Sequence, residues 1–140
     1  MKKKCVYTCI TGDYDEVKTF PNLNENEFDY YLFTNNKKIR SDFWKVIYID
    51  NDGLDNIRLA RKIKVLGHDI LSDYDITIWL DGASYPKMLI SEFINDCCDL
   101  KKYCLVGFKH RERNCIYDEA ITCVKVKKDK REIIESQMLK

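Results

Sequence analysis

The chain has 140 residues, with 24 Lys and Arg against 23 Asp and Glu, so its net charge at pH 7 is only +1. This length leaves room for one domain with a substantial hydrophobic core, and we expect a single domain over residues 1–140. The balanced charge argues against a nucleic-acid-binding protein, which needs a cationic excess on one face.

Seven cysteines, an odd number without a paired framework, are typical of reduced thiols inside the cell. The basic start, Met1–Tyr7, lacks the apolar region and cleavage site of a signal peptide. No stretch approaches the roughly 18 apolar residues of a membrane-spanning helix. We therefore expect a soluble, cytoplasmic protein. Zinc is not expected, because no C-x-x-C pair occurs.

Short runs of β-branched and aromatic residues predict the strands. The first three are Cys5–Thr11, Asp29–Thr34 and Trp44–Ile49. A fourth, Asp75–Asp81, is almost continuously apolar, as is typical of a central strand that is covered on both faces. Tyr103–Phe108 is predicted to be a fifth strand.

An apolar stripe at helical spacing predicts a helix over Asn56–Ser72. The stripe consists of Leu59, Ile63, Leu66 and Ile70. Further helices are expected at Met88–Cys98, at Tyr117–Lys127 and after Asp129 as an N-cap. This alternation of strands and helices predicts an α/β fold with a mostly parallel sheet flanked by helices.

Three polar clusters follow predicted strands, at Gly12–Asp15, Asp81–Ser84 and His110–Arg113. Ligands of open α/β sheets bind outside the carboxyl ends of the strands, so we expect these clusters to converge. Neither G-x-G-x-x-G nor G-x-x-x-x-G-K-[ST] is present. A bound nucleotide would therefore have to be held by charges or by a metal.

Asp81 is the strongest single candidate for a functional carboxylate. It closes an apolar strand and is followed by Gly82, which allows a tight turn. It could be a ligand for Mg²⁺ or Mn²⁺ that bridges a nucleotide diphosphate. Alternatively, its side chain opens the turn by hydrogen bonding to its own backbone, as is common for Asp-Gly.

Several motifs occur together in a fixed order. They are Val6–Asp15, Asp29–Thr34, Arg58-x-x-Arg61, Ile78–Gly82 and His110-x-x-Arg113-x-Cys115-Ile116-Tyr117-x-Glu119-Ala120. This set covers most of the chain. It resembles the GT-A-type glycosyltransferase-like family of bacteria and plants, long known as a domain of unknown function and related to plant mucilage and cell-wall glycosyltransferase-like proteins.

The resemblance implies a Rossmann-like nucleotide-diphospho-sugar transferase fold with a sugar-nucleotide site. The residues that it places beside the nucleoside are Thr11, Gly12, Asp13 and Tyr14. Asp81 takes the place of the metal-binding acidic motif for Mg²⁺ or Mn²⁺, although it supplies one carboxylate instead of two. The alternative is that His110 and Arg113 neutralise the leaving diphosphate, for which the planar guanidinium is well suited.

Four more residues have two interpretations each. The N-terminus of their helix could carry Arg58 and Arg61 towards a phosphate, or the two arginines could belong to a solvated face. Glu119 could be the general base that deprotonates an acceptor hydroxyl, or an acid that favours the first turn of a helix. Tyr14 could stack on a base, or belong to the core as aromatic residues of strands usually do.

Two functions follow from these observations. The first is a hexosyltransferase-type enzyme that transfers a sugar from a nucleotide-diphosphate donor to a glycan or other acceptor in surface polysaccharide or glycan synthesis. The second is a non-catalytic or truncated module of the same fold that binds a nucleotide or glycan. Because GT-A domains usually extend further, one expectation is that the chain is C-terminally truncated.

Overall fold

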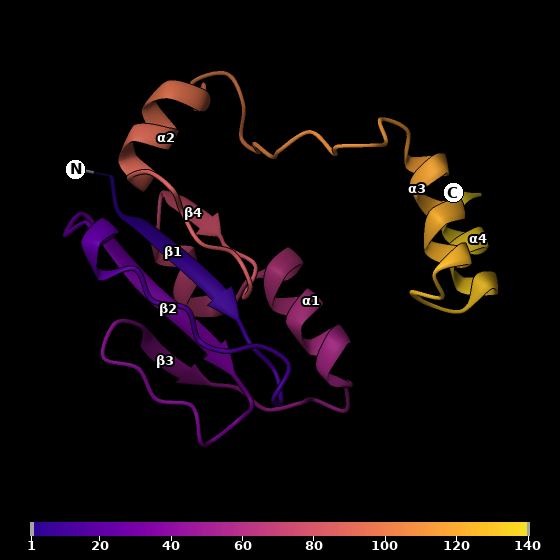
Figure 1. The fold of residues 1–140 in the computed structure, drawn as a ribbon, viewed down its shortest axis with the longest axis horizontal. Coiled ribbons are helices and arrows are strands. Elements are labelled where there is room, and N and C mark those ends of the chain that lie inside the picture. The colour runs from indigo at the N-terminus through magenta and orange to yellow at the C-terminus, as the bar shows by residue number, and fades with distance from the viewer. Residues whose placement is uncertain (1, 140) are drawn as a thin grey trace. The chain divides into compact units, whose positions relative to one another are not determined.

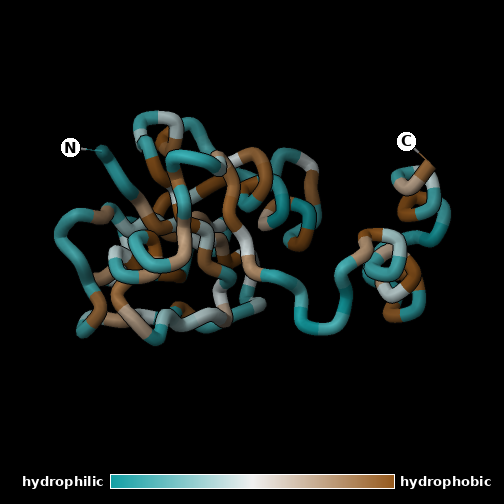
Figure 2. The backbone as a smooth tube through the Cα atoms, turned by 90° about the horizontal axis from the view of Figure 1, so that it is seen from above, coloured by the Kyte–Doolittle hydropathy of each residue, from teal (hydrophilic) through white to brown (hydrophobic). Residues whose placement is uncertain are grey.

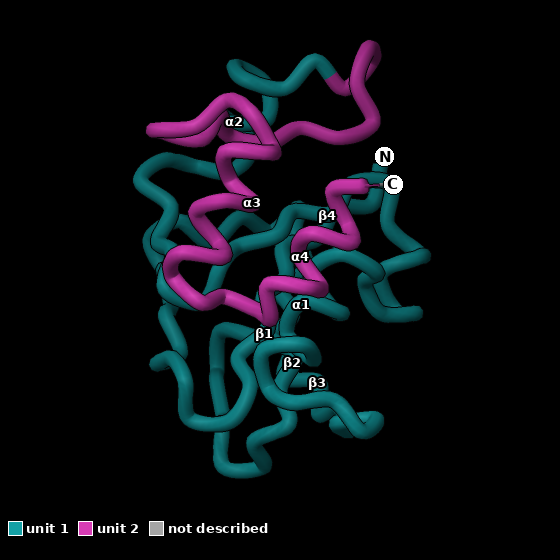
Figure 3. The backbone as a smooth tube through the Cα atoms, turned by 90° about the vertical axis from the view of Figure 1, so that its right-hand side faces the viewer, with its two compact units in different colours: residues 1–99 teal, residues 100–140 magenta. Residues whose placement is uncertain are grey.

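The computed structural model describes residues 2–139. Contacts within the chain divide it into two compact units, residues 1–99 and residues 100–140 (Figure 3). The expectation of one domain over the whole chain stays a prediction.

The first unit is built on a four-stranded sheet in which every pair of neighbouring strands is parallel. Its strands are β1 (Lys4–Cys9), β2 (Phe28–Thr34), β3 (Lys45–Tyr48) and β4 (Ile76–Trp79). The order across the sheet is β3-β2-β1-β4 (Figure 1). The α/β class and the parallel sheet predicted from the sequence are therefore confirmed.

Side chains of β1 alternate between two cores, one on each face of the sheet. Val6 belongs to the cluster that includes Ile90 and Ile94 of α2 (Ile90–Cys97). Its neighbour Tyr7 belongs to the other cluster, together with Ile63 of α1 (Asn56–Leu66). Apolar stretches run through the interior of this unit, whereas polar stretches follow its loops (Figure 2). Burial on both faces thus fixes β1 in the middle of the unit.

β4 is an edge strand of the described sheet, so the prediction of a central strand was wrong. It pairs with β1 alone among the strands of residues 2–139, and Thr77 is exposed. The chain passes from β3 through α1 to the far side of β1 before it forms β4. An apolar run does not specify this position, since strand order depends on the crossover and not on local sequence.

The first helix is shorter than predicted. It ends at Gly67, whose φ of 74° breaks the helical path. A short 3₁₀ segment, η2 (Asp69–Asp73), follows and buries Leu71. Leu66 is therefore not part of the buried stripe, and its side chain is 77% exposed. A smaller 3₁₀ turn, η1 (Pro21–Leu23), lies between β1 and β2.

The second unit contains α3 (Ile116–Lys125) and α4 (Arg131–Met138), which pack together. The strand predicted at Tyr103–Phe108 is not formed. Residues 100–139 include no strand that could supply it with ladder hydrogen bonds. The N-cap of α4 is Lys130 instead of Asp129. Within residues 2–139, no helix is both long and apolar enough to cross a lipid bilayer.

Candidate functional site

The candidate site lies where the loops after β1 and β4 meet. The chain leaves β1 for β2 on one side, whereas β4 lies on the other side of β1, which makes this the topological switch point of the sheet. A Cβ atom added to Gly82 would lie 2.9 Å from Asp15 Oδ2 and 3.2 Å from Ile10 Cγ1. The predicted convergence of the first two polar clusters is therefore confirmed.

The loop after β1 depends on the glycine at position 12. Gly12 has φ +60°, and a Cβ there would meet Asn56 Nδ2 at 2.6 Å. Its N–H donates to Asn35 Oδ1 (2.7 Å), and its carbonyl accepts from Asn36 Nδ2 (3.1 Å). Both backbone groups of Gly12 are thus engaged within the protein, which favours a role in shaping the loop. Its substrate-binding role stays a prediction.

Asn35 joins this loop to the start of α1. Its Nδ2 donates to Asn51 Oδ1 (2.7 Å) and to Asn56 Oδ1 (2.9 Å). The buried hydroxyl of Thr11 donates to the Asn56 carbonyl (2.8 Å), so its proton is not available to a substrate. Asn35 and its neighbour Asn36 are not among the residues predicted for the site. The sequence feature that could have indicated them is their position directly after the predicted strand Asp29–Thr34. At that position, asparagines are also typical of an ordinary turn.

An open depression of ≈ 400 Å³ lies over the same loop. It is lined by Gly12, Asp13, Tyr14, Asp15, Glu16, Val17, Asn36 and Ile39. The Tyr14 ring is 81% exposed, and Asp13 is oriented by a 2.8 Å hydrogen bond from Asn36 Nδ2. The charged residues of this lining are all acidic, so the depression favours hydroxyl and N–H donors over phosphates.

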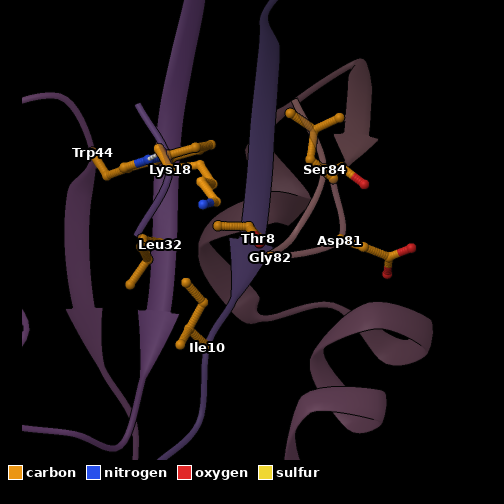
Figure 4. Close-up of a pocket in the computed structure, with 9 residues that line it drawn as sticks. Thr8, Ile10, Lys18, Leu32, Trp44, Asp81, Gly82 and Ser84 are labelled. Atoms are coloured by element: carbon orange, nitrogen blue, oxygen red, sulfur yellow. Dashed lines mark hydrogen bonds between the residues drawn. The ribbon is translucent and has the colours of Figure 1, made fainter. Parts of the chain in front are cut away.

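The Asp81 carboxylate is directed away from Thr8 and Lys18 (Figure 4). Its Oδ1 accepts hydrogen bonds from Lys64 Nζ (2.8 Å) and Trp79 Nε1 (2.7 Å). Burial acts to raise the pKa of Asp81, but the hydrogen bonds from Lys64 and Trp79 and the Lys64 charge outweigh it, so the pKa lies below its ordinary value. In the turn itself, it is the Asp81 carbonyl that accepts from Ser84 N (2.7 Å).

The hydrogen-bond donors around Asp81 affect whether its carboxylate can bind the predicted metal ion. No group of three or more His, Cys, Asp or Glu side chains in the described part of the chain could hold an ion. A divalent cation on Asp81 would have to compete with the ammonium group of Lys64 for the same oxygen. The Asp81 turn therefore does not fit a resident Mg²⁺ or Mn²⁺ in this arrangement.

The N-terminus of α1 is already capped. Asp55 Oδ1 accepts from Arg58 N (2.8 Å), and the guanidinium of Arg58 pairs with the same carboxylate. Arg61 is exposed. These contacts favour the solvated-face interpretation of the two arginines over phosphate binding.

Within the second unit, Arg113 brings three predicted residues together. Its Nη2 lies 2.9 Å from His110 Nε2, and its Nε donates to the Glu119 carboxylate. The hydrogen bond from Arg113 is the main reason that the pKa of Glu119 is lowered. Because a lowered pKa makes a carboxylate a weaker base, these contacts favour a structural role for Glu119 at the start of α3.

The molecule is thus an α/β protein whose polar loops meet at the switch point of a parallel sheet, an arrangement typical of nucleotide-binding proteins. A family model described as TOD1/MUCI70, glycosyltransferase-like domain, matches residues 2–140. The chain therefore belongs to the TOD1/MUCI70 glycosyltransferase-like family, which confirms the glycosyltransferase-like resemblance seen in the sequence. Comparisons with curated proteins and with solved structures gave no significant match.

Proposed function

We propose that this chain is the donor-binding part of a GT-A glycosyltransferase of the hexosyltransferase type. It transfers a sugar from a nucleoside diphosphate to a glycan or other acceptor in the synthesis of surface polysaccharide or another glycan. The observation that carries this proposal is the contact between Asp15 and Gly82, which joins the two loops at the switch point. The family match supports the same reaction class.

The charges around the two loops suggest how the donor is oriented. The acidic depression at Asp13–Glu16 receives the nucleoside, with Tyr14 stacking on the base and the carboxylates accepting from ribose hydroxyls or base N–H groups. Lys64, paired with Asp81, lies at the other loop. The nucleoside end of a nucleoside diphosphate is uncharged, whereas the diphosphate end is anionic. The nucleoside therefore lies at the acidic depression, and the diphosphate lies towards Lys64.

Catalysis in this proposal rests on stabilising the negative charge of the leaving diphosphate. Within the second unit, His110 and Arg113 are the cationic candidates for binding a phosphate, and Glu119 is the candidate base for an acceptor hydroxyl. A phosphate that binds Arg113 would compete with Glu119 for the guanidinium, which would free the carboxylate and raise its pKa towards the ordinary value. Phosphate binding at Arg113 would thus make Glu119 a stronger base.

The alternative function is a binding module of the same fold that holds a nucleotide or glycan without turnover. The capped helix N-terminus at Asp55 and the lowered pKa of Glu119 favour this alternative, because both remove a predicted catalytic contact. Under either proposal we place the protein in the cytoplasm, on account of its seven free cysteines.

Thermal unfolding with UDP, GDP and CDP, each with and without Mn²⁺, tests the donor site. A nucleotide at a hundredfold excess over Kd should stabilise the protein by about 2.7 kcal/mol. Tyr14→Ala should lose most of this gain, because base stacking contributes about 1–3 kcal/mol. Tyr117→Ala, which truncates an exposed tyrosine of α3, is the matched control and should keep it.

Absence of a shift with every nucleotide would contradict both the enzyme and the module. If a shift is present, the release of free nucleotide from a sugar donor over time separates the two, because only the enzyme turns over. A shift that requires Mn²⁺ and disappears in Asp81→Ala would support the metal interpretation of Asp81 after all.

A further inference from the structure

A second, much smaller cavity lies beneath the Asp81 turn. Its volume is ≈ 10 Å³, about the space that one water-sized atom occupies. The cavity is lined by Thr8, Ile10, Lys18, Leu32, Trp44, Leu80, Asp81, Gly82 and Ser84 (Figure 4). Lys18 of this lining directly follows Val17, a residue of the acidic depression, in the chain.

Thr8 contributes an unpartnered hydroxyl to this cavity. Thr8 lies on β1 between the core residues Val6 and Ile10 of the same face, and its side chain is only 3% exposed. Its Oγ1 is buried and has no hydrogen-bond partner among the described residues. A buried hydroxyl without a partner is costly, so a group that supplies one is expected to bind there. The hydroxyl can serve as a donor to such a group.

Lys18 contributes a positive charge to the same cavity. Its backbone is fixed, because the Lys18 carbonyl accepts from Nε1 of the buried Trp44 (2.7 Å). Its ammonium group makes one ion pair, with the exposed Glu16 at a distance of 3.9 Å. A pair this long and this exposed adds little to stability. Lys18 can thus turn its charge to a ligand at low cost.

From these contacts we infer that Thr8 and Lys18 form a subsite for one anionic oxygen of a ligand phosphate. Both residues offer donors, a hydroxyl and an ammonium, so they select an acceptor, and an anionic acceptor binds most strongly. The small volume admits a single oxygen atom at the base of the cavity. This inference rests on the proposed function, in which that phosphate belongs to the diphosphate of the donor.

Two substitutions at position 8 separate binding from folding. Thr8→Val keeps the shape but removes the hydroxyl, so the melting temperature of the free protein should not fall. The same variant should bind inorganic pyrophosphate and nucleoside diphosphates about tenfold more weakly. Thr8→Ser keeps the hydroxyl but loses a buried methyl group, so it should melt lower and yet bind like the wild type. If Thr8 were purely structural, the variant with the lower melting temperature would not be the one that keeps wild-type binding.

Lys18→Met tests the charge while it keeps the apolar stem, and it should weaken pyrophosphate binding by about tenfold or more. The control is Lys62→Met, which removes a lysine of α1 that pairs with Asp52 and should leave binding unchanged. The measurement is thermal shift and isothermal titration at fixed ionic strength. Isothermal titration does not depend on a change in stability.

Three results would overturn the subsite. A lower melting temperature of free Thr8→Val would show that the hydroxyl already has a partner in the fold, such as a buried water. Unchanged pyrophosphate binding in Thr8→Val or in Lys18→Met would remove that residue from the site. No binding of pyrophosphate or of any nucleotide to the wild type would overturn the subsite together with the proposed function. Binding of pyrophosphate alone, weakened in both variants, would support the subsite and contradict the nucleotide donor.

Discussion

The two loops at the switch point are held in different ways. Neutral amides hold the loop after β1, where Asn35 and Asn36 engage both backbone groups of Gly12. Charge holds the side chain of Asp81 after β4, through its pair with Lys64. Hydrogen bonds between amides do not titrate, whereas an exposed ion pair responds to pH and salt. The loop after β1 is therefore a fixed part of the candidate site, and the Asp81 turn is the part that can change.

The largest effect is expected from Gly12→Ala. The substitution places a Cβ at 2.6 Å from Asn56 Nδ2 and at a φ of +60°, so both a contact and the backbone become strained. We expect a loss of about 3 kcal/mol in the free energy of unfolding, measured by urea denaturation.

Gly53→Ala is the matched control for that variant. Gly53 has φ +74°, but nothing lies within 4 Å of the added Cβ. The backbone cost alone, about 1 kcal/mol, should remain. Equal losses in the two variants would mean that the Asn56 contact does not constrain the loop.

An intermediate effect is expected from Asn35→Ala. It removes the acceptor of the Gly12 N–H and both amide hydrogen bonds to Asn51 and Asn56. The expected loss in the free energy of unfolding is about 2 kcal/mol, measured by urea denaturation. Asn22→Ala, at an exposed asparagine of η1, should cost under about 0.5 kcal/mol. If Asn35→Ala left the free energy of unfolding unchanged, the amide hydrogen bonds would not be what supports the loop.

The smallest effect is expected from Lys64→Met, because the pair with Asp81 is exposed and contributes under about 1 kcal/mol. The pKa of Asp81 is lowered below its ordinary value of 3.8, so the contribution of the pair is complete above that pH and is lost as the pH falls through the folded pKa. NMR titration should show a higher Asp81 pKa in the variant. An unchanged pKa would mean that Trp79 alone holds the carboxylate.

The sequence predicted the parallel sheet well, because β1 and β2 are covered on both faces and read as apolar runs between turns. It failed where structure depends on partners far away in the chain. The position of β4 at the edge is set by the crossover through α1. The run Tyr103–Phe108 has strand composition, but in its own unit it lacks a neighbouring strand.

The candidate site was predicted in part. Gly12, Asp15 and Gly82 were placed together correctly, because the carboxyl ends of parallel strands meet at one edge. The partners of Asp81 were missed, since Lys64 is separated from it by 17 residues and looked like part of a solvated face. The one trace of the small cavity was Thr8, a hydroxyl among the apolar residues of a core strand.

Burial of β1 has a further consequence for Cys5 and Cys9. Burial raises the pKa of both thiols to about 12, with the Asp29 charge adding to the effect at Cys5. Neither thiol can form the reactive thiolate at neutral pH while the sheet is closed. Cys97 and Cys104, by contrast, are exposed. Cys97 and Cys104 should therefore react with an alkylating reagent at once, whereas Cys5 and Cys9 should react only when the sheet opens. The alkylation rate of Cys5 and Cys9 thus reports how often the sheet opens.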